Sequence, residues 1–144
     1  MKYEFTGLTK SFYGVTVRQI KRISDGVIGG WIESEKNLDQ DGDCFVYDNA
    51  VVYGNALVYG NAWVSDNARV SGNALVAGNA LVSGNAWVSG NAWVYGDAVI
   101  SGNAWVSGNA WVSGNASVYG DAVVTGNARV SGNASVSGNE VVTD

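Results

Sequence analysis

The stretch NAWVSGNAWVYG, residues 85–96, decides the fold, because the six-residue unit that it contains twice recurs along most of the chain. Sixteen consecutive hexads of the form x-Val-Ser/Tyr-Gly-Asn-Ala run without insertion from Phe45 to Glu140. The second position is Val in fifteen hexads and Ile100 in the other, and the sixth is Ala in fifteen and Glu140 in the last. A repeat this regular predicts one small structural unit stacked many times.

Each hexad combines a short alternating stretch with a corner. In Ala86-Trp87-Val88-Ser89, Ala and Val point to one side and Trp and Ser to the other. The Gly-Asn pair that follows suits a bend, because Gly accepts positive φ and Asn tolerates left-handed backbone. Strand and corner in alternation predict a coil with the valines and alanines inside and positions one and three of every hexad outside.

The pattern is similar to the hexapeptide repeat of left-handed parallel β-helices, which has an aliphatic residue at one position and a small residue four later. The resemblance implies an all-β fold, a single-stranded left-handed parallel β-helix with three hexads in each 18-residue triangular coil. A right-handed solenoid, as in bactofilin-like polymers, fits the alternation too. The run from Gly29 to Leu38 resembles the first segment of bacterial and phage proteins of this type, which are often labelled acetyltransferases or polymer-forming proteins from the repeat alone.

The chain divides into an N-terminal β cap, residues 1–26, and the parallel β-helix, residues 27–144, with its regular hexads at 45–140. Within the cap, the composition predicts two short strands, Tyr3–Thr6 and Val15–Ile23, joined by turns at Gly7 and Gly14.

The hexad phase can be extended backwards from Phe45 into the less regular residues. It places Ile28 at the interior position two, and Ile32, Leu38 and Cys44 at position six. An imperfect first coil is therefore expected from about Val27.

The overall charge argues against two classes of partner. Eight basic and thirteen acidic residues give a net charge of −5, and residues 39–144 hold two basic against nine acidic residues. We therefore expect neither nucleic acid nor an anionic membrane as a partner. With a single cysteine, no signal-peptide pattern and no long apolar run, we expect a cytoplasmic protein.

No catalytic constellation is found, and the sequence predicts a protein that is not an enzyme and uses no cofactor. Hexapeptide acyltransferases, which this chain resembles in its repeat, use a histidine as general base, and this chain contains none. Cys44 has no histidine to activate it and is expected to fill the core. Asp39, Asp41 and Asp43 alternate like calcium ligands but do not follow the EF-hand spacing, so an acidic turn and no metal site is expected.

The side chains at the outward positions of the hexads give the remaining indication of function. With 18 residues per coil, each face carries position-one residues from every third hexad: Val51, Arg69, Trp87, Trp105 and Val123 on the first; Leu57, Leu75, Trp93, Trp111 and Arg129, beside Tyr95, on the second; Phe45, Trp63, Leu81, Val99, Ser117 and Ser135 on the third. Four tryptophans flank the edge between the first two faces, a larger apolar patch than monomers usually expose. We therefore predict a homotrimer in which the first face of each subunit packs on the second face of its neighbour.

The expected oligomer or ligand contacts are Trp87, Trp93, Trp105, Trp111, Tyr95, Arg69 and Arg129. The favoured function is a non-enzymatic, self-assembling scaffold or binding module. One alternative is a phage or bacterial accessory protein that sequesters a nucleotide-like ligand, or a sugar, or a host protein in clefts between subunits. Others are a degenerate acyltransferase relative, or tryptophans that merely stabilise neighbouring strands.

Overall fold

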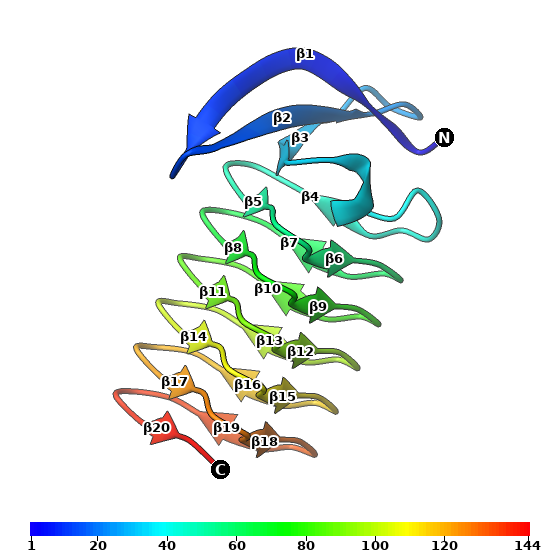
Figure 1. The fold of residues 1–144 in the computed structure, drawn as a ribbon. Helices are drawn as coiled ribbons and strands as arrows, with labels where there is room; N and C mark the ends of the chain where they lie inside the picture. Colours follow the sequence, from blue (N-terminus) through cyan, green and yellow to red (C-terminus); the bar gives the residue numbers. More distant parts are fainter.

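The repeat folds into a solenoid of two-residue strands, described for all of residues 1–144 in a computed structural model (Figure 1). Its strands form three parallel ladders, which we name faces one, two and three. Face one contains β5 (Val51–Val52), β8 (Arg69–Val70), β11 (Trp87–Val88), β14 (Trp105–Val106), β17 (Val123–Val124) and β20 (Val141–Val142). Face two contains β6 (Leu57–Val58), β9 (Leu75–Val76), β12 (Trp93–Val94), β15 (Trp111–Val112) and β18 (Arg129–Val130). Face three contains β4 (Phe45–Val46), β7 (Trp63–Val64), β10 (Leu81–Val82), β13 (Val99–Ile100), β16 (Ser117–Val118) and β19 (Ser135–Val136).

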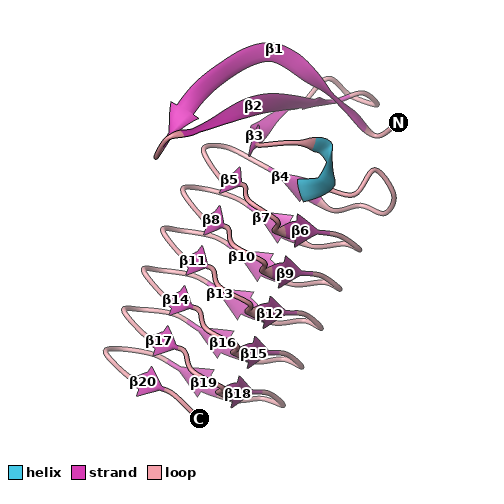
Figure 2. Ribbon diagram, viewed as in Figure 1, coloured by secondary structure: helices cyan, strands magenta, loops and turns pink.

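Strands that pair on one face are 18 residues apart, as Trp87 and Trp105 are on face one. The chain therefore makes about six turns of a single-stranded parallel β-helix, which confirms the predicted fold class. Figure 2 shows the same short strands and long corners in every turn after the first. Backbone hydrogen bonds join the turns, for example from the N–H of Trp87 to the carbonyl of Ala104 at 2.9 Å.

The core lies inside the coil, where the valines of position two and the alanines of position six form most of one cluster of 36 buried residues. Val94 and Ala92, for example, are both fully buried. Successive turns place identical side chains one above another, so the interior is a continuous column. The predicted division into inward and outward positions is confirmed.

The corners depend on glycine for two reasons. Gly90 has a φ of 64°, and a Cβ there would lie 2.9 Å from the backbone nitrogen of Gly108 in the next turn. The asparagines after the glycines form ladders, since the Nδ2 of Asn73 donates to Asn91 at 3.0 Å and that of Asn91 to Asn109 at 3.2 Å. Gly and Asn together thus allow the turns to stack closely.

A β-hairpin arches over the N-terminal end of the coil (Figure 1). Its strands β1 (Tyr3–Phe12) and β2 (Val15–Arg22) are antiparallel, and β2 pairs with β3 (Ile28–Ile32), which continues the ladder of face one. The predicted turn at Gly14 is confirmed, with φ values of 49° at Tyr13 and 81° at Gly14. The predicted turn at Gly7 is wrong: its φ of 97° accommodates a bulge within β1, so the strand continues.

The hairpin is fixed to the first turn by buried and partly buried hydrogen bonds. The hydroxyl of Tyr3 donates to the carbonyl of Leu38 at 2.6 Å, and Oε1 of Gln40 accepts from the backbone N–H of Lys2 at 2.7 Å. The 3₁₀ turn η1 (Glu35–Asn37) directly precedes Leu38, and its buried Asn37 donates to the carbonyl of Ala56 at 2.8 Å. Burial raises the pKa of the Tyr3 hydroxyl, and the nearby carboxylate of Glu35 adds to the rise.

The first turn does not keep the hexad phase. Ile32 pairs with Val52 and Leu38 with Val58, which are 20 residues apart, so both occupy the interior valine position and not position six. Phe45 already pairs at the regular distance with Trp63, so the two additional residues lie in the 39–44 loop. For the same reason Ile28 is 51% exposed and the prediction that it lies inside is wrong.

Candidate functional site

A pair of stacked indoles lies on face one. The rings of Trp87 and Trp105 are 5.2 Å apart and inclined by only 6°. Each indole N–H donates to a serine of the preceding turn, Trp87 to Ser71 at 3.1 Å and Trp105 to Ser89 at 3.2 Å. These bonds fix the orientation of the two stacked rings, and Trp105 remains 42% exposed.

A second aromatic group lies on face two. Trp93 and Trp111 meet edge to face with centroids 5.1 Å apart, and the ring of Tyr95 is 5.1 Å from that of Trp93. The guanidinium of Arg129 lies 4.6 Å from the centre of the Trp111 ring. The indole N–H of Trp93 is buried and has no acceptor. This face therefore combines a broad aromatic surface with one unsatisfied donor.

The two pairs belong to the same two turns, since β11 precedes β12 and β14 precedes β15 directly. Arg69, one turn before Trp87, is instead engaged by the cap. Its guanidinium lies 4.7 Å from the ring centre of Tyr13 and donates to the Tyr13 hydroxyl at 3.1 Å. Six of the seven residues predicted as contacts therefore lie on faces one and two away from the cap. The seventh, Arg69, is partly covered by the tip of the hairpin.

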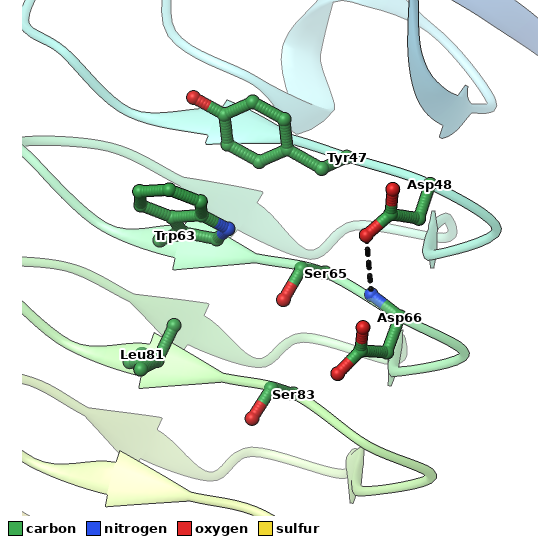
Figure 3. Close-up of a pocket in the computed structure, with 7 residues that line it drawn as sticks. All are labelled: Tyr47, Asp48, Trp63, Ser65, Asp66, Leu81 and Ser83. Atoms are coloured by element: carbon green, nitrogen blue, oxygen red, sulfur yellow. Dashed lines mark hydrogen bonds between the residues drawn. The ribbon is translucent and has the colours of Figure 1, made fainter.

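Face three contains a hollow that the sequence reasoning did not single out. It has a volume of about 410 Å³ and is lined by Tyr47, Asp48, Trp63, Ser65, Asp66, Leu81 and Ser83 (Figure 3). The rings of Tyr47 and Trp63 are 4.5 Å apart and inclined by 33°, and Trp63 is 49% exposed. We name this site the face-three hollow.

Two aspartates form the corner of the face-three hollow. Asp48 and Asp66 occupy position four, where the other fourteen hexads have glycine, and they adopt left-handed φ values of 57° and 59°. Oδ2 of Asp48 accepts from the N–H of Asp66 at 3.2 Å (Figure 3). In the same way, Oδ2 of Asp66 accepts from the N–H of Gly84 at 3.0 Å. Neither carboxylate has an ion-pair partner. These departures from glycine were the signal in the sequence that could have located the hollow.

A second hollow of about 580 Å³ adjoins the first at Tyr47 and Trp63 and is lined on its far side by Lys2 and Arg22. Both cations are already engaged within the protein. Arg22 donates to the Tyr47 hydroxyl at 2.9 Å and pairs with Asp25 at 3.0 Å, while Nζ of Lys2 donates to the carbonyl of Cys44 at 2.6 Å. The two carboxylates of the face-three hollow, in contrast, have no cationic partner.

Cys44, the candidate nucleophile, and the three aspartates of the 39–44 loop, the candidate metal ligands, do not form a reactive site. Cys44 is fully buried, and burial raises the pKa of its thiol although the Lys2 ammonium opposes the rise. In the neighbouring loop, Asp39 accepts the N–H of Asp41 at 3.1 Å, and Asp43 donates its own N–H to Asn61. These carboxylates do not form a group that could hold a metal ion.

The chain contains no helix of the length and hydrophobicity needed to span a membrane. No curated protein matches it. The YdcK β-solenoid repeat matches it in six overlapping or adjacent stretches: residues 45–60, 52–66, 62–78, 68–84, 80–96 and 98–114. These stretches cover the residues that line the face-three hollow and all four tryptophans of the two pairs. Together with the coil itself, the matches make this chain a repeat protein of the β-solenoid type.

Proposed function

We propose that the protein is a non-enzymatic scaffold or binding module of the cytoplasm that assembles into a homotrimer through faces one and two. The observation that carries this proposal is that the two tryptophan pairs occupy the same two turns of the solenoid. Trp87 and Trp93 belong to one turn, and Trp105 and Trp111 to the next.

The shared turns matter because of symmetry. A threefold axis parallel to the solenoid axis rotates each subunit without shifting it along the axis. Face one of one subunit then meets face two of its neighbour with the turns level, so the indoles of Trp87 and Trp105 approach those of Trp93 and Trp111. Aromatic clusters that are buried in this way are the typical centres of stable interfaces.

The flanking residues suit such a contact. Above and below the aromatic centre lie Arg69 and Arg129, whose guanidinium groups already lie over Trp87 and Trp111 at 5.6 and 4.6 Å. Arginine at the rim of an aromatic patch matches the usual composition of interfaces. The acceptor-free N–H of Trp93 also favours a rearrangement of face two when a neighbour supplies an acceptor.

The non-enzymatic part of the proposal is supported by residue chemistry. The chain has no histidine, and its single thiol is buried with a raised pKa, so neither of the two side chains that most often act near neutral pH is available.

The test is the molar mass in solution, measured by light scattering and sedimentation velocity. We expect a trimer for the wild type and dissociation for the double variant Trp87→Ser/Trp111→Ser, because serine already occupies the same hexad position at Ser117 and Ser135. The matched control is Trp63→Ser on face three, which should remain a trimer. A monomeric wild type, or a trimer that survives the double substitution, would refute the proposal.

A further inference from the structure

We propose that the face-three hollow binds a small organic cation, a guanidinium or ammonium group, between the indole of Trp63 and the carboxylates of Asp48 and Asp66. This site is separate from the proposed trimer contact, because that contact uses faces one and two and the hollow lies on face three. The proposal therefore does not depend on the proposed function.

The aromatic wall supplies the first part of the recognition. Trp63 is 49% exposed although its strand β7 has a neighbour on both sides, β4 and β10, and Tyr47 supports its ring at 4.5 Å. The face of an indole attracts cations through its quadrupole, more strongly than the rings of Tyr or Phe. No lysine or arginine of the chain lies over Trp63, whereas cations of the protein cover Trp31, Trp87 and Trp111.

The carboxylates supply the second part. Each uses one oxygen, Oδ2, to accept a backbone N–H of the next turn, which fixes its orientation and leaves the other oxygen free. Because adjacent turns are about 4.8 Å apart, the two free carboxylate groups are spaced by about 5 Å. The five N–H donors of a planar guanidinium can reach two acceptors at this spacing while the plane of the group lies on an aromatic ring.

The fold itself does not require these aspartates. Glycine fills the same corner position in fourteen of sixteen hexads, and left-handed backbone costs a non-glycine residue stability that glycine does not lose. Two like charges on adjacent turns, without a counter-ion in the protein, add repulsion. A bound cation removes this repulsion, whereas a neutral sugar stacked on Trp63 would leave it in place.

The hollow also has a polarity that suits a small ligand with an apolar part. Leu81 lies one turn below Trp63, and the hydroxyl-bearing residues Ser65 and Ser83 lie between the aromatic wall and the aspartates (Figure 3). An alkyl chain can therefore contact Leu81 while its charged end meets the carboxylates.

The experiment is a titration followed by the indole N–H signals in a two-dimensional ¹H–¹⁵N spectrum, in which the six tryptophans report separately. The Trp63→Leu variant assigns the signal of interest, and leucine is already present at this position of the hexad at Leu81. The probes are N-acetyl-arginine amide, N-acetyl-lysine amide and tetramethylammonium. N-acetyl-citrulline amide serves as the neutral analogue of the arginine probe, and glucose as a neutral sugar.

We expect the cationic probes to shift the Trp63 signal in a saturable way and the citrulline probe to bind at least about tenfold more weakly, with affinity falling as salt rises. The variant Asp48→Gly/Asp66→Gly restores the common corner residue and should lose binding by a similar factor while keeping the fold. Its matched control, Asp97→Asn/Asp121→Asn, removes the same charge from two other corners and should bind as the wild type does.

Three outcomes would overturn the proposal. They are the absence of a saturable shift up to about 10 mM of every cationic probe, equal binding of the arginine and citrulline probes, and unchanged affinity in Asp48→Gly/Asp66→Gly. Binding of glucose without binding of the cationic probes would show that the hollow takes a neutral ligand and not a cation. Because all these readouts are local to face three, they hold whether the protein is a monomer or a trimer.

Discussion

The buried hydroxyl of Tyr3 predicts that the cap loosens at alkaline pH, and Tyr3→Phe tests this directly. In the folded protein this hydroxyl donates to the Leu38 carbonyl at 2.6 Å, and burial holds its pKa above the ordinary value. At neutral pH the substitution removes the donor and leaves the buried carbonyl without its partner. We expect it to lower the free energy of unfolding by about 1–2 kcal/mol.

The pH dependence has a defined sign and size. Since the pKa of Tyr3 is raised on folding, its contribution is complete below the unfolded pKa of about 10 and is lost as the pH rises above it. At pH 11 the unfolded chain has released this proton and the folded chain retains it, which costs about 1.4 kcal/mol. Phenylalanine has no proton to release, so the stability gap between the two proteins should nearly close.

The measurement is urea unfolding followed by tryptophan fluorescence at pH 8, 9, 10 and 11 for both proteins. The difference between them cancels the titration of all other groups. A gap that stays constant from pH 8 to pH 11 would show that the Tyr3 pKa is not raised by the cap, and would contradict this reasoning.

Three further predictions concern the core, the thiol and the corners. Val94→Ala removes two methyl-sized groups from the buried column, about 1.6 kcal/mol of transfer free energy, and should cost about 2–3 kcal/mol with the cavity included, whereas Val141→Ala at a 63% exposed position should cost less than about 0.5 kcal/mol in the same urea titration. Cys44→Ala should remove a part of the alkaline decline that begins near pH 9, because burial raises the pKa of this thiol; an unchanged profile in urea titrations would count against it. Asn91→Ala breaks both side-chain bonds of its ladder and should lower stability by about 0.5–1 kcal/mol, while Asn91→Asp keeps the acceptor for Asn73 and should cost less, which thermal unfolding can resolve.

The regular part of the fold could be predicted from the sequence because one hexad specifies all of its own contacts. Val at position two and Ala at position six pack against the same positions of neighbouring hexads, so the six-residue period predicts which side chains point inward. The 18-residue turn, which pairs Trp87 with Trp105, came from the family resemblance and is confirmed. The left-handed sense of winding came from the resemblance to hexapeptide-repeat proteins and stays a prediction.

The first turn could not be predicted in the same way. Its two additional residues in the 39–44 loop shift Ile32 and Leu38 from the alanine to the valine position. Extrapolating the period backwards cannot detect such an insertion, because both positions accept an apolar residue. Gly7 was misassigned because a glycine with positive φ is equally suited to a bulge and to a turn.

The face-three hollow was missed because the search for a site followed the number of tryptophans. Trp63 is a single indole on its face, and Asp48 and Asp66 look like ordinary corner residues until each is compared with the glycine of every other hexad. In a chain this repetitive, departures from the consensus carry more information about binding than the most abundant residue does.

Because equivalent turns are stacked, the separation of two surface features along the solenoid axis can change only by whole turns. Adding or deleting one whole 18-residue turn between β10 and β11 would move the tryptophan pairs by about 4.8 Å relative to the aspartates, without changing the contacts inside either group. Such a protein can therefore adjust the separation of two surface features in fixed steps through duplication of a short segment, a change that few globular folds tolerate.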